Sequence, residues 1–286
     1  MHYILKISEF SPEKTLIGGQ CFRWRREPPT GENENENETS PIYSGFAGNR
    51  ALSLRRTAEG IELLNVREEE IPFWRRYFDT DTDYGAIRRR FSADETLRRA
   101  SEAGLGLRVL RQEPFETLIS FILSQNNHIP RIRGIVERLC ASFGDPIGGE
   151  GGEEGEGEKG CGFPSAERLA SLDEKALAPL RAGFRARYIL DAAKKVADGT
   201  VRLGEIGELP LDEGRAELKK IVGVGDKVAD CVLLFGYHKL EAFPSDVWIK
   251  RIVAEYYREG LPEWIGAERG IAQQYLFEYF RNAPDD

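Results

Sequence analysis

The chain has 286 residues, of which 41% are hydrophobic, and it carries a formal net charge of −8. This length accommodates one large domain or two modest ones, and the hydrophobic fraction is sufficient for a buried core. No apolar run approaches the roughly 20 residues that span a bilayer. Since the start also lacks the long apolar stretch of a signal peptide, we expect an intracellular protein that contacts no membrane.

The net negative charge comes from two tracts rich in Gly, Glu and Asn, at residues 31–40 and 148–162. Each tract has a net charge of −4, so the rest of the chain is charge-balanced and can present a basic face to a polyanion. Neither tract can bury apolar surface, and we interpret both as disordered surface insertions.

The four cysteines are widely separated along the chain; they are Cys21, Cys140, Cys161 and Cys231. None of them has the close spacing of a zinc knuckle or of a clustered iron–sulfur site. We therefore expect free thiols in a reducing compartment and no metal site.

The N-terminal region is β-rich, with short strand candidates separated by turn residues at 3–7, 21–24, 42–46 and 51–54. From about residue 71 the apolar spacing becomes helical, and Pro114 stands at a natural helix start before the apolar positions of 115–123. Further helices are predicted at 165–174, 185–198, 212–222, 227–236, 246–258 and 265–281.

This order of elements predicts an α+β protein. An antiparallel β-rich domain would cover residues 1–70, with an acidic insertion at 29–40. A mostly helical domain would cover residues 71–286, with an acidic disordered loop at 146–162.

The segment LKKIVGVGDKVAD at 218–230 ends one helix, turns at Gly223 and Gly225, and begins another. Backbone N–H groups at such a positive helix end cradle a phosphate. This pattern is the helix-hairpin-helix motif, which holds the DNA backbone without reading its sequence. Taken alone, a glycine-rich turn between two ordinary helices explains it equally well.

Lys227 stands at the start of the second helix, where a lysine is electrostatically unfavourable. The misfit is explained if the amine must lose its proton to act as a nucleophile, because positive potential and desolvation both lower an ammonium pKa. Asp246 follows 19 positions later, where the next helix begins. Asp is also a favoured helix N-cap, so only the two residues together predict a lysine nucleophile assisted by a carboxylate.

With these residues in place, GVGDKVADCVLLF and FPSDVWIKRI resemble the helix-hairpin-helix glycosylases that carry a Gly/Pro-rich loop and an Asp. Within that superfamily, the chain resembles the 8-oxoguanine DNA glycosylases of the eukaryotic kind. Similar segments run in order from about residue 16 to residue 280; they are GGQCFRW at 18–24, LRQEPFE at 110–116, SQNNH at 124–128, GFRARY at 183–188 and AQQYLF at 272–277.

The resemblance implies a β domain like that of the TATA-binding protein, packed on a helical glycosylase domain with the lesion pocket between them. It implies removal of 8-oxoguanine opposite cytosine: Lys227 forms a Schiff base with the deoxyribose, Asp246 stabilises the developing positive charge, and β-elimination cuts the strand. It further implies a monomer that acts on damaged double-stranded DNA without a metal or organic cofactor.

The resemblance also assigns a base pocket. The backbone carbonyl of Gly19 would accept the N7 hydrogen that only the oxidised guanine carries. Cys231 and Phe277 would sandwich the flipped base, and Gln273 would bond its Watson–Crick edge. Gln273 and Phe277 are four positions apart, so one helix face can supply both.

A second group of residues would contact the DNA around the lesion. Asn126, Arg131 and Arg185 would read the orphaned cytosine, and Phe184 would wedge into the gap in the base stack. The full DNA-binding set implied by the resemblance is Asn126, Asn127, Arg131, Phe184, Arg185, Gly223 and Gly225.

Two alternatives stay open from the sequence. The first is a glycosylase of the same superfamily that removes an oxidised pyrimidine or a mispaired adenine, although scattered cysteines and Lys227 weigh against it. The second is a non-catalytic helix-hairpin-helix DNA-binding protein, which would need no Lys227–Asp246 pair. Simpler roles are also available: Phe277 could be a core residue, and Asn126 and Asn127 could end a helix.

Overall fold

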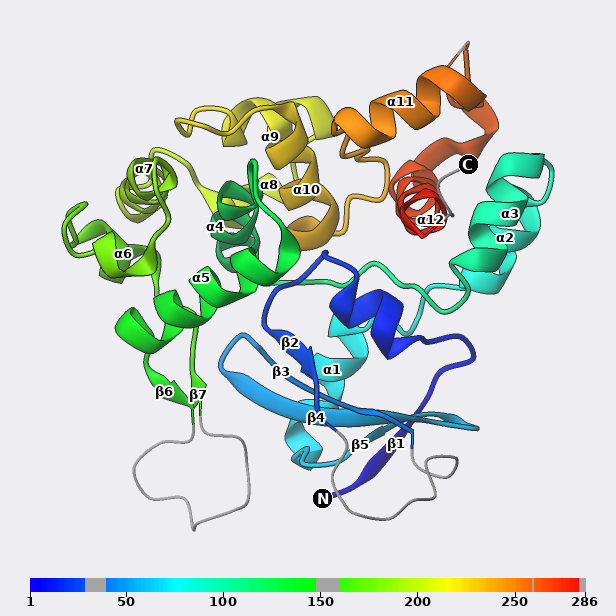
Figure 1. Cartoon of the computed structure of the whole chain (residues 1–286), viewed down its shortest axis with the longest axis horizontal. Coiled ribbons are helices and arrows are strands. Elements are labelled where there is room, and N and C mark those ends of the chain that lie inside the picture. Colours follow the sequence, from blue (N-terminus) through cyan, green and yellow to red (C-terminus); the bar gives the residue numbers. More distant parts are fainter. Residues whose placement is uncertain (29–39, 148–159, 259, 283–286) are drawn as a thin grey trace.

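The computed structural model describes residues 1–28, 40–147, 160–258 and 260–282. A five-stranded antiparallel sheet in the order β1-β5-β4-β3-β2 lies at one end of the molecule, and most of the helices lie above it in Figure 1. The strands are β1 (Tyr3–Lys6), β2 (Trp24–Arg26), β3 (Ile42–Ala47), β4 (Arg50–Thr57) and β5 (Gly60–Leu63). The predicted antiparallel N-terminal region and the mostly helical remainder are both confirmed.

Two details of the strand prediction were wrong. The strand expected at 21–24 lies at Trp24–Arg26, because Cys21 and Phe22 are buried in a loop that runs against the helices. The fifth strand, β5, was not predicted: it has only 4 residues and returns directly from β4, so its period-2 signal is short.

One face of the sheet is covered by α1 (Ile71–Tyr77), as Figure 1 shows. Leu52 and Leu54 of β4 point into this layer at the period of 2 expected for a half-buried strand. Trp24 is 1% exposed there and its indole N–H donates to the Tyr77 hydroxyl at 3.0 Å. Helix α1 lies after residue 70 but packs into the same core as the sheet. The domain boundary at residue 70 therefore stays a prediction.

The other helices form a second core. They are α2 (Tyr84–Phe91), α3 (Glu95–Ala103), α4 (Pro114–Ser124), α5 (Ile129–Phe143), α6 (Ala166–Ala170), α7 (Arg185–Ala197), α8 (Leu203–Ile206), α9 (Leu211–Leu218), α10 (Asp226–Tyr237), α11 (Val247–Tyr256) and α12 (Arg269–Arg281). The helix predicted at 265–281 is divided: η4 (Glu263–Glu268) precedes α12 and is broken at Gly266, whose φ is +59°. No helix among the described residues has both the length and the apolar character needed to cross a membrane.

Helix α4 is the centre of this second core. Every residue from 117 to 123 is buried, and α10 packs along it. The run is mostly apolar, with Thr117 and Ser120 as its polar members, and so suits a helix inside the protein rather than on its surface. The helix beginning at Pro114, predicted from sequence, is confirmed, with the proline in the first turn where its missing N–H costs nothing.

The loop before β2 fastens the sheet to α4. The buried Gln20 amide donates to the Arg108 carbonyl at 2.7 Å and accepts from the Leu110 N–H at 2.9 Å. Arg23 forms a buried ion pair with Glu116 of α4 at 3.1 Å. The polar residues of GGQCFRW therefore connect the sheet to the helical part of the chain. They follow a bend at Gly18 and Gly19, here called the diglycine bend.

The predicted disordered insertions lie mostly outside the described residues. At the edges of the second one, the prediction was wrong: β6 (Pro146–Ile147) and β7 (Gly160–Cys161) form a short antiparallel ladder. The ladder is stabilised from outside the insertion, because the guanidinium of Arg23 donates to the Cys161 carbonyl at 2.5 Å.

Deletion of residues 32–39 and 149–158 is expected to leave the fold and the activity intact. Gly148 and Lys159 would then join β6 to β7 as a two-residue connection, and shortening a loop changes its closure entropy by only about 0.6 kcal/mol per halving. Loss of the carboxylates should tighten non-specific DNA binding at low salt. Thermal melting and a filter-binding titration at two salt concentrations test this, and a fall in Tm of more than about 5 °C would contradict it.

Candidate active site

Lys227 is the second residue of α10, two positions after the N-cap Gly225. Its Nζ lies 3.4 Å from Ser124 Oγ and 5.1 Å from the centroid of the Phe121 ring, both on α4. Within the described parts of the chain, no carboxylate lies within ion-pair distance of this amine. Lys227 is therefore half-buried, held by a hydroxyl and an aromatic face, and left without an acidic partner.

Asp246 is the N-cap of α11, and its carboxylate accepts the Ile249 N–H at 2.8 Å. The simpler interpretation of this residue as a helix cap is thus confirmed. Cys231 lies one turn after Lys227 on α10. Burial raises the pKa of its thiol to about 11, the charge of Lys227 lowers that pKa, and the charge of Asp246 raises it. The charges of Lys227 and Asp246 thus both act on the Cys231 thiol, but Asp246 makes no ion pair with the Lys227 amine.

The hairpin between α9 and α10 has the form expected of a phosphate-binding turn. Gly223 has a φ of +84°, and a Cβ there would lie 2.4 Å from the Tyr188 ring, so a larger residue does not fit. Among the described residues, the N–H groups of Gly223 and Gly225 have no hydrogen-bond partner. These donors, at the N-terminus of α10, are available to an anion.

The segment between α4 and α5 carries the residues predicted to read cytosine. Asn126 is exposed with a φ of +47°, a conformation that asparagine tolerates better than most residues. Arg185 donates to the carbonyl oxygens of Gln125 and Asn126, the latter at 3.0 Å, and so fixes this turn from below. Asn127 lies just after α4, and its Nδ2 donates to the Leu123 carbonyl of the last helical turn at 3.2 Å.

Two further residues of this set lie at the surface. Arg131 is exposed. Burial lowers the pKa of the Arg185 guanidinium, and the charge of Arg131 lowers it further. Phe184 is 47% exposed, with the Arg185 guanidinium 4.5 Å from its ring centroid. An exposed aromatic ring supported from behind by a cation fits the predicted wedge.

The predicted base pocket draws on three segments. Gly19, in the diglycine bend, has a φ of +107°, and a Cβ there would lie 2.8 Å from Ile129 Cδ1. Gln273 and Cys231 are 4% and 2% exposed, on α12 and α10 respectively. Phe277 of α12 is half-buried, with the Arg281 guanidinium 5.4 Å from its ring centroid. In Figure 1, α12 lies between α11 and η1 (Glu13–Ile17), the short helix that directly precedes the diglycine bend.

Three residues that contact this site were missed in the sequence. Ser124 and Phe121 touch the Lys227 amine, and Arg281 links α12 to the diglycine bend. Ser124 and Phe121 are three positions apart and so share a face of α4, but nothing local indicates which helix that face meets.

This geometry, with free hairpin donors, an unpaired lysine and a carboxylate capping the next helix, is that of a helix-hairpin-helix protein with a candidate nucleophile beside an anion-binding turn. Sequence comparisons agree: residues 119–261 match the HhH-GPD superfamily of base excision DNA repair proteins, and residues 2–118 match the N-terminal domain of 8-oxoguanine DNA glycosylase. The chain belongs to the 8-oxoguanine DNA glycosylase family.

Solved structures support this membership along nearly the whole chain. The structure of MBOgg1 in complex with a low-affinity DNA ligand is 40% identical, with a TM-score of 0.84, and covers 95% of this chain and 92% of that one. The 8-oxoguanine glycosylase/lyase of Clostridium acetobutylicum, solved with double-stranded DNA containing cytosine opposite 8-oxoguanine, is 35% identical with a TM-score of 0.82 and the same coverage. An N-glycosylase/DNA lyase of Saccharomyces cerevisiae is 38% identical over 164 residues, which make up 54% of this chain but 42% of the yeast protein.

Proposed function

We propose that this chain removes 8-oxoguanine paired with cytosine from double-stranded DNA and then cleaves the strand at the resulting site. The observation that carries the proposal is Lys227: its amine has no acidic partner among the described residues and contacts only Ser124, Phe121 and Cys231. Family membership supports the same activity, since relatives bear the name N-glycosylase/DNA lyase. The proposal takes the acting species to be a single intracellular chain.

The chemistry follows from the amine. Nζ of Lys227 in its neutral form attacks C1′ of the deoxyribose, the C1′–N9 bond breaks, and the base leaves with the bonding electron pair. After Nζ loses a proton, its lone pair breaks the C1′–O4′ bond, O4′ takes up a proton as the sugar ring opens, and a protonated imine joins Nζ to C1′. A proton then leaves C2′, and the C3′–O bond breaks to release the 3′ phosphate by β-elimination.

Asp246 supports this sequence electrostatically. The sugar gains positive charge as the base leaves, and a fixed carboxylate near it stabilises that charge best when it is preorganised. The hydrogen bond from Ile249 N–H holds the carboxylate in place at the start of α11. Burial keeps the Cys231 thiol protonated at neutral pH, since its pKa is raised to about 11, so Cys231 offers a neutral wall to the base instead of a second nucleophile.

The DNA would lie across the hairpin and the α4–α5 turn. The free N–H groups of Gly223 and Gly225 would bind a phosphate, while Asn126 and Arg131 would face the cytosine and Phe184 would fill the gap left by the flipped base. Arg185 already donates to three protein carbonyls, those of Gln125, Asn126 and Ala182, so we assign it the additional task of holding Asn126 in place.

The decisive experiment uses a set of duplexes, each with a single lesion. Every lesion is tested opposite each of the four bases in turn. Base release and strand scission are scored separately, by chromatography of the free base and by gel before and after alkali. The proposal expects release of 8-oxoguanine fastest opposite cytosine, with some scission before alkali. Preference for an oxidised pyrimidine or for mispaired adenine would contradict it.

Substitution Gln273→Ala is expected to lower kcat/KM for 8-oxoguanine about tenfold, as for loss of one or two hydrogen bonds, while the preference over guanine changes little. Oxidation at C8 barely alters the Watson–Crick edge, so Gln273 cannot distinguish the lesion alone. Parallel assays on lesion and undamaged duplexes test this. Cleavage of undamaged guanine by the variant would show that Gln273 reads the lesion after all.

A further inference from the structure

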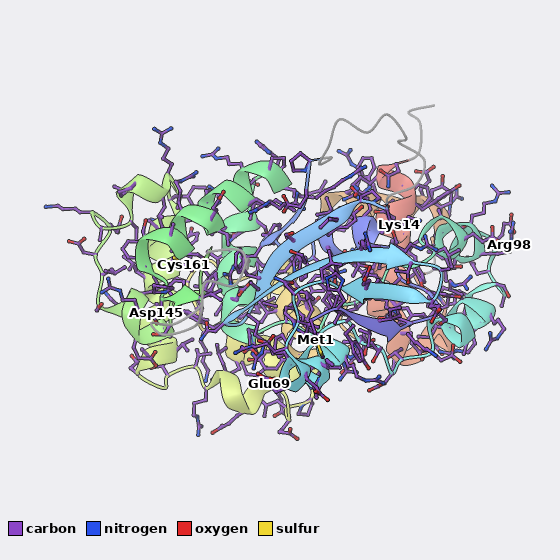
Figure 2. All side chains as sticks on the ribbon, turned by 90° about the horizontal axis from the view of Figure 1, so that it is seen from below. Met1, Lys14, Glu69, Arg98, Asp145 and Cys161 are labelled. Carbon is purple, nitrogen blue, oxygen red and sulfur yellow. The ribbon has the colours of Figure 1, made fainter. Side chains whose placement is uncertain are left out.

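A single side chain fastens the end of α12 to the diglycine bend. Nη1 of Arg281 donates to the Gly18 carbonyl at 2.7 Å, across 263 positions of sequence, and Nη2 donates to Glu278 Oε2 at 2.7 Å. Figure 2 shows Lys14 of η1 beside α12, and Figure 1 places the same two segments together. Arg281 therefore joins the two segments that carry Gly19 and Phe277.

The same guanidinium lies against Phe277. Its Cζ is 5.4 Å from the ring centroid, inside the distance of about 6 Å at which a cation is attracted to an aromatic face. Phe277 and Arg281 are one helical turn apart and so share a face of α12. The flat, forked guanidinium can touch the ring and the carbonyl together, which the point charge of a lysine does less well.

Glu278 fixes the direction of the guanidinium. Its carboxylate is buried, at 7% exposure, and accepts from Arg281 through one oxygen and from Asn282 Nδ2 at 3.0 Å through the other. With both oxygens engaged, the carboxylate has one orientation, and so has the guanidinium bonded to it.

The bond to Gly18 has a geometric consequence for Gly19. A peptide unit is planar, so anchoring the Gly18 carbonyl fixes the plane in which the Gly19 nitrogen lies. The Gly19 carbonyl is then placed by that residue's own dihedral angles, with φ at +107°. Glycine is flexible there, and an external anchor is what makes its carbonyl direction definite.

We propose that Arg281 is a positioning residue for lesion recognition, which sets the Gly19 carbonyl and the Phe277 ring at a fixed separation. The carbonyl meets the N7 hydrogen of the oxidised base while the ring meets its face. This inference rests on the proposed function, because it takes Gly19 as the group that reads the lesion.

The experiment separates base recognition from the chemistry of Lys227. Arg281→Met retains an unbranched side chain against Phe277 but loses the N–H donors of the guanidinium. Arg281→Lys retains a positive charge and one donor nitrogen. Each variant is assayed for release of 8-oxoguanine and for cleavage of a preformed abasic site, which offers no base to recognise. Arg269→Met is the matched control, since Arg269 is an exposed residue at the other end of the same helix.

We expect Arg281→Met to lower kcat/KM for 8-oxoguanine about tenfold to a hundredfold and to reduce its preference over guanine, as for loss of a charged hydrogen bond. Arg281→Met should cleave the abasic site at the wild-type rate. For 8-oxoguanine, kcat/KM of Arg281→Lys should lie between the values of wild type and Arg281→Met, and Arg269→Met should match wild type. Equal loss of both activities with a lowered Tm, or no loss of either, would overturn the inference. A wild-type protein that releases no 8-oxoguanine would instead overturn the proposed function, and this inference with it.

Discussion

Lys227→Gln is expected to abolish both base release and strand cleavage while lesion-duplex binding persists. Glutamine retains length and polarity beside Ser124 but cannot form an imine, so no covalent route remains. The measurement is borohydride trapping, which reduces the imine to a stable protein–DNA adduct. Wild type should give this adduct, with peptide mapping placing it on Lys227, and Lys227→Gln should give none.

The matched control is Lys219→Gln, at the end of α9. Like Lys227, Lys219 lies next to the hairpin, but its amine forms an ion pair with Asp226 at 2.7 Å. We expect this variant to trap as wild type does. A full-strength adduct from Lys227→Gln would assign the chemistry to another amine, with Lys219 and Lys220 as the first candidates.

Asp246→Asn is expected to slow base release by about a hundredfold to a thousandfold, the usual loss of about 2.7–4 kcal/mol when one preorganised electrostatic partner is removed. Asparagine caps helices as well as aspartate does, so the bond to Ile249 N–H and the fold should survive. Since the Lys227 amine remains, some borohydride adduct should still form. Single-turnover rates with wild type and variant measure the effect.

A second substitution at the same position separates cap from charge. Asp246→Ala removes both, and should lower the free energy of unfolding by about 0.5–2 kcal/mol in addition to slowing the reaction. Asp246→Asn should leave the free energy of unfolding nearly unchanged. If both variants lost stability and activity in proportion, Asp246 would be a structural cap without a part in the chemistry.

Local signals carried much of the sequence prediction. Pro114 marked the start of α4, the two glycines marked the hairpin, and the apolar spacing after Lys227 placed α10. Each depends on residues within a few positions of one another, which is where helix caps and periodicity operate. The roles of the predicted catalytic, base and cytosine contacts stay predictions.

The contacts missed in the sequence join distant segments. Ser124 is 103 positions from Lys227, and Gly18 is 263 positions from Arg281. Such pairs are set by how helices and loops pack, which no window of sequence reports. The β6–β7 ladder was missed for the same reason, because the Arg23 guanidinium that stabilises it lies far away in the chain.

The central position of α4 bears on how this protein unfolds. The boundary between the two matching families falls at 118/119, inside α4 and between two residues that are both 0% exposed. Phe121 of the same helix packs edge-on against Phe22 and stacks on Phe235, with centroids 5.7 and 5.4 Å away. The two regions thus share one helix, so a fragment cut at that boundary would break it, and unfolding of either region in the intact chain should destabilise the other.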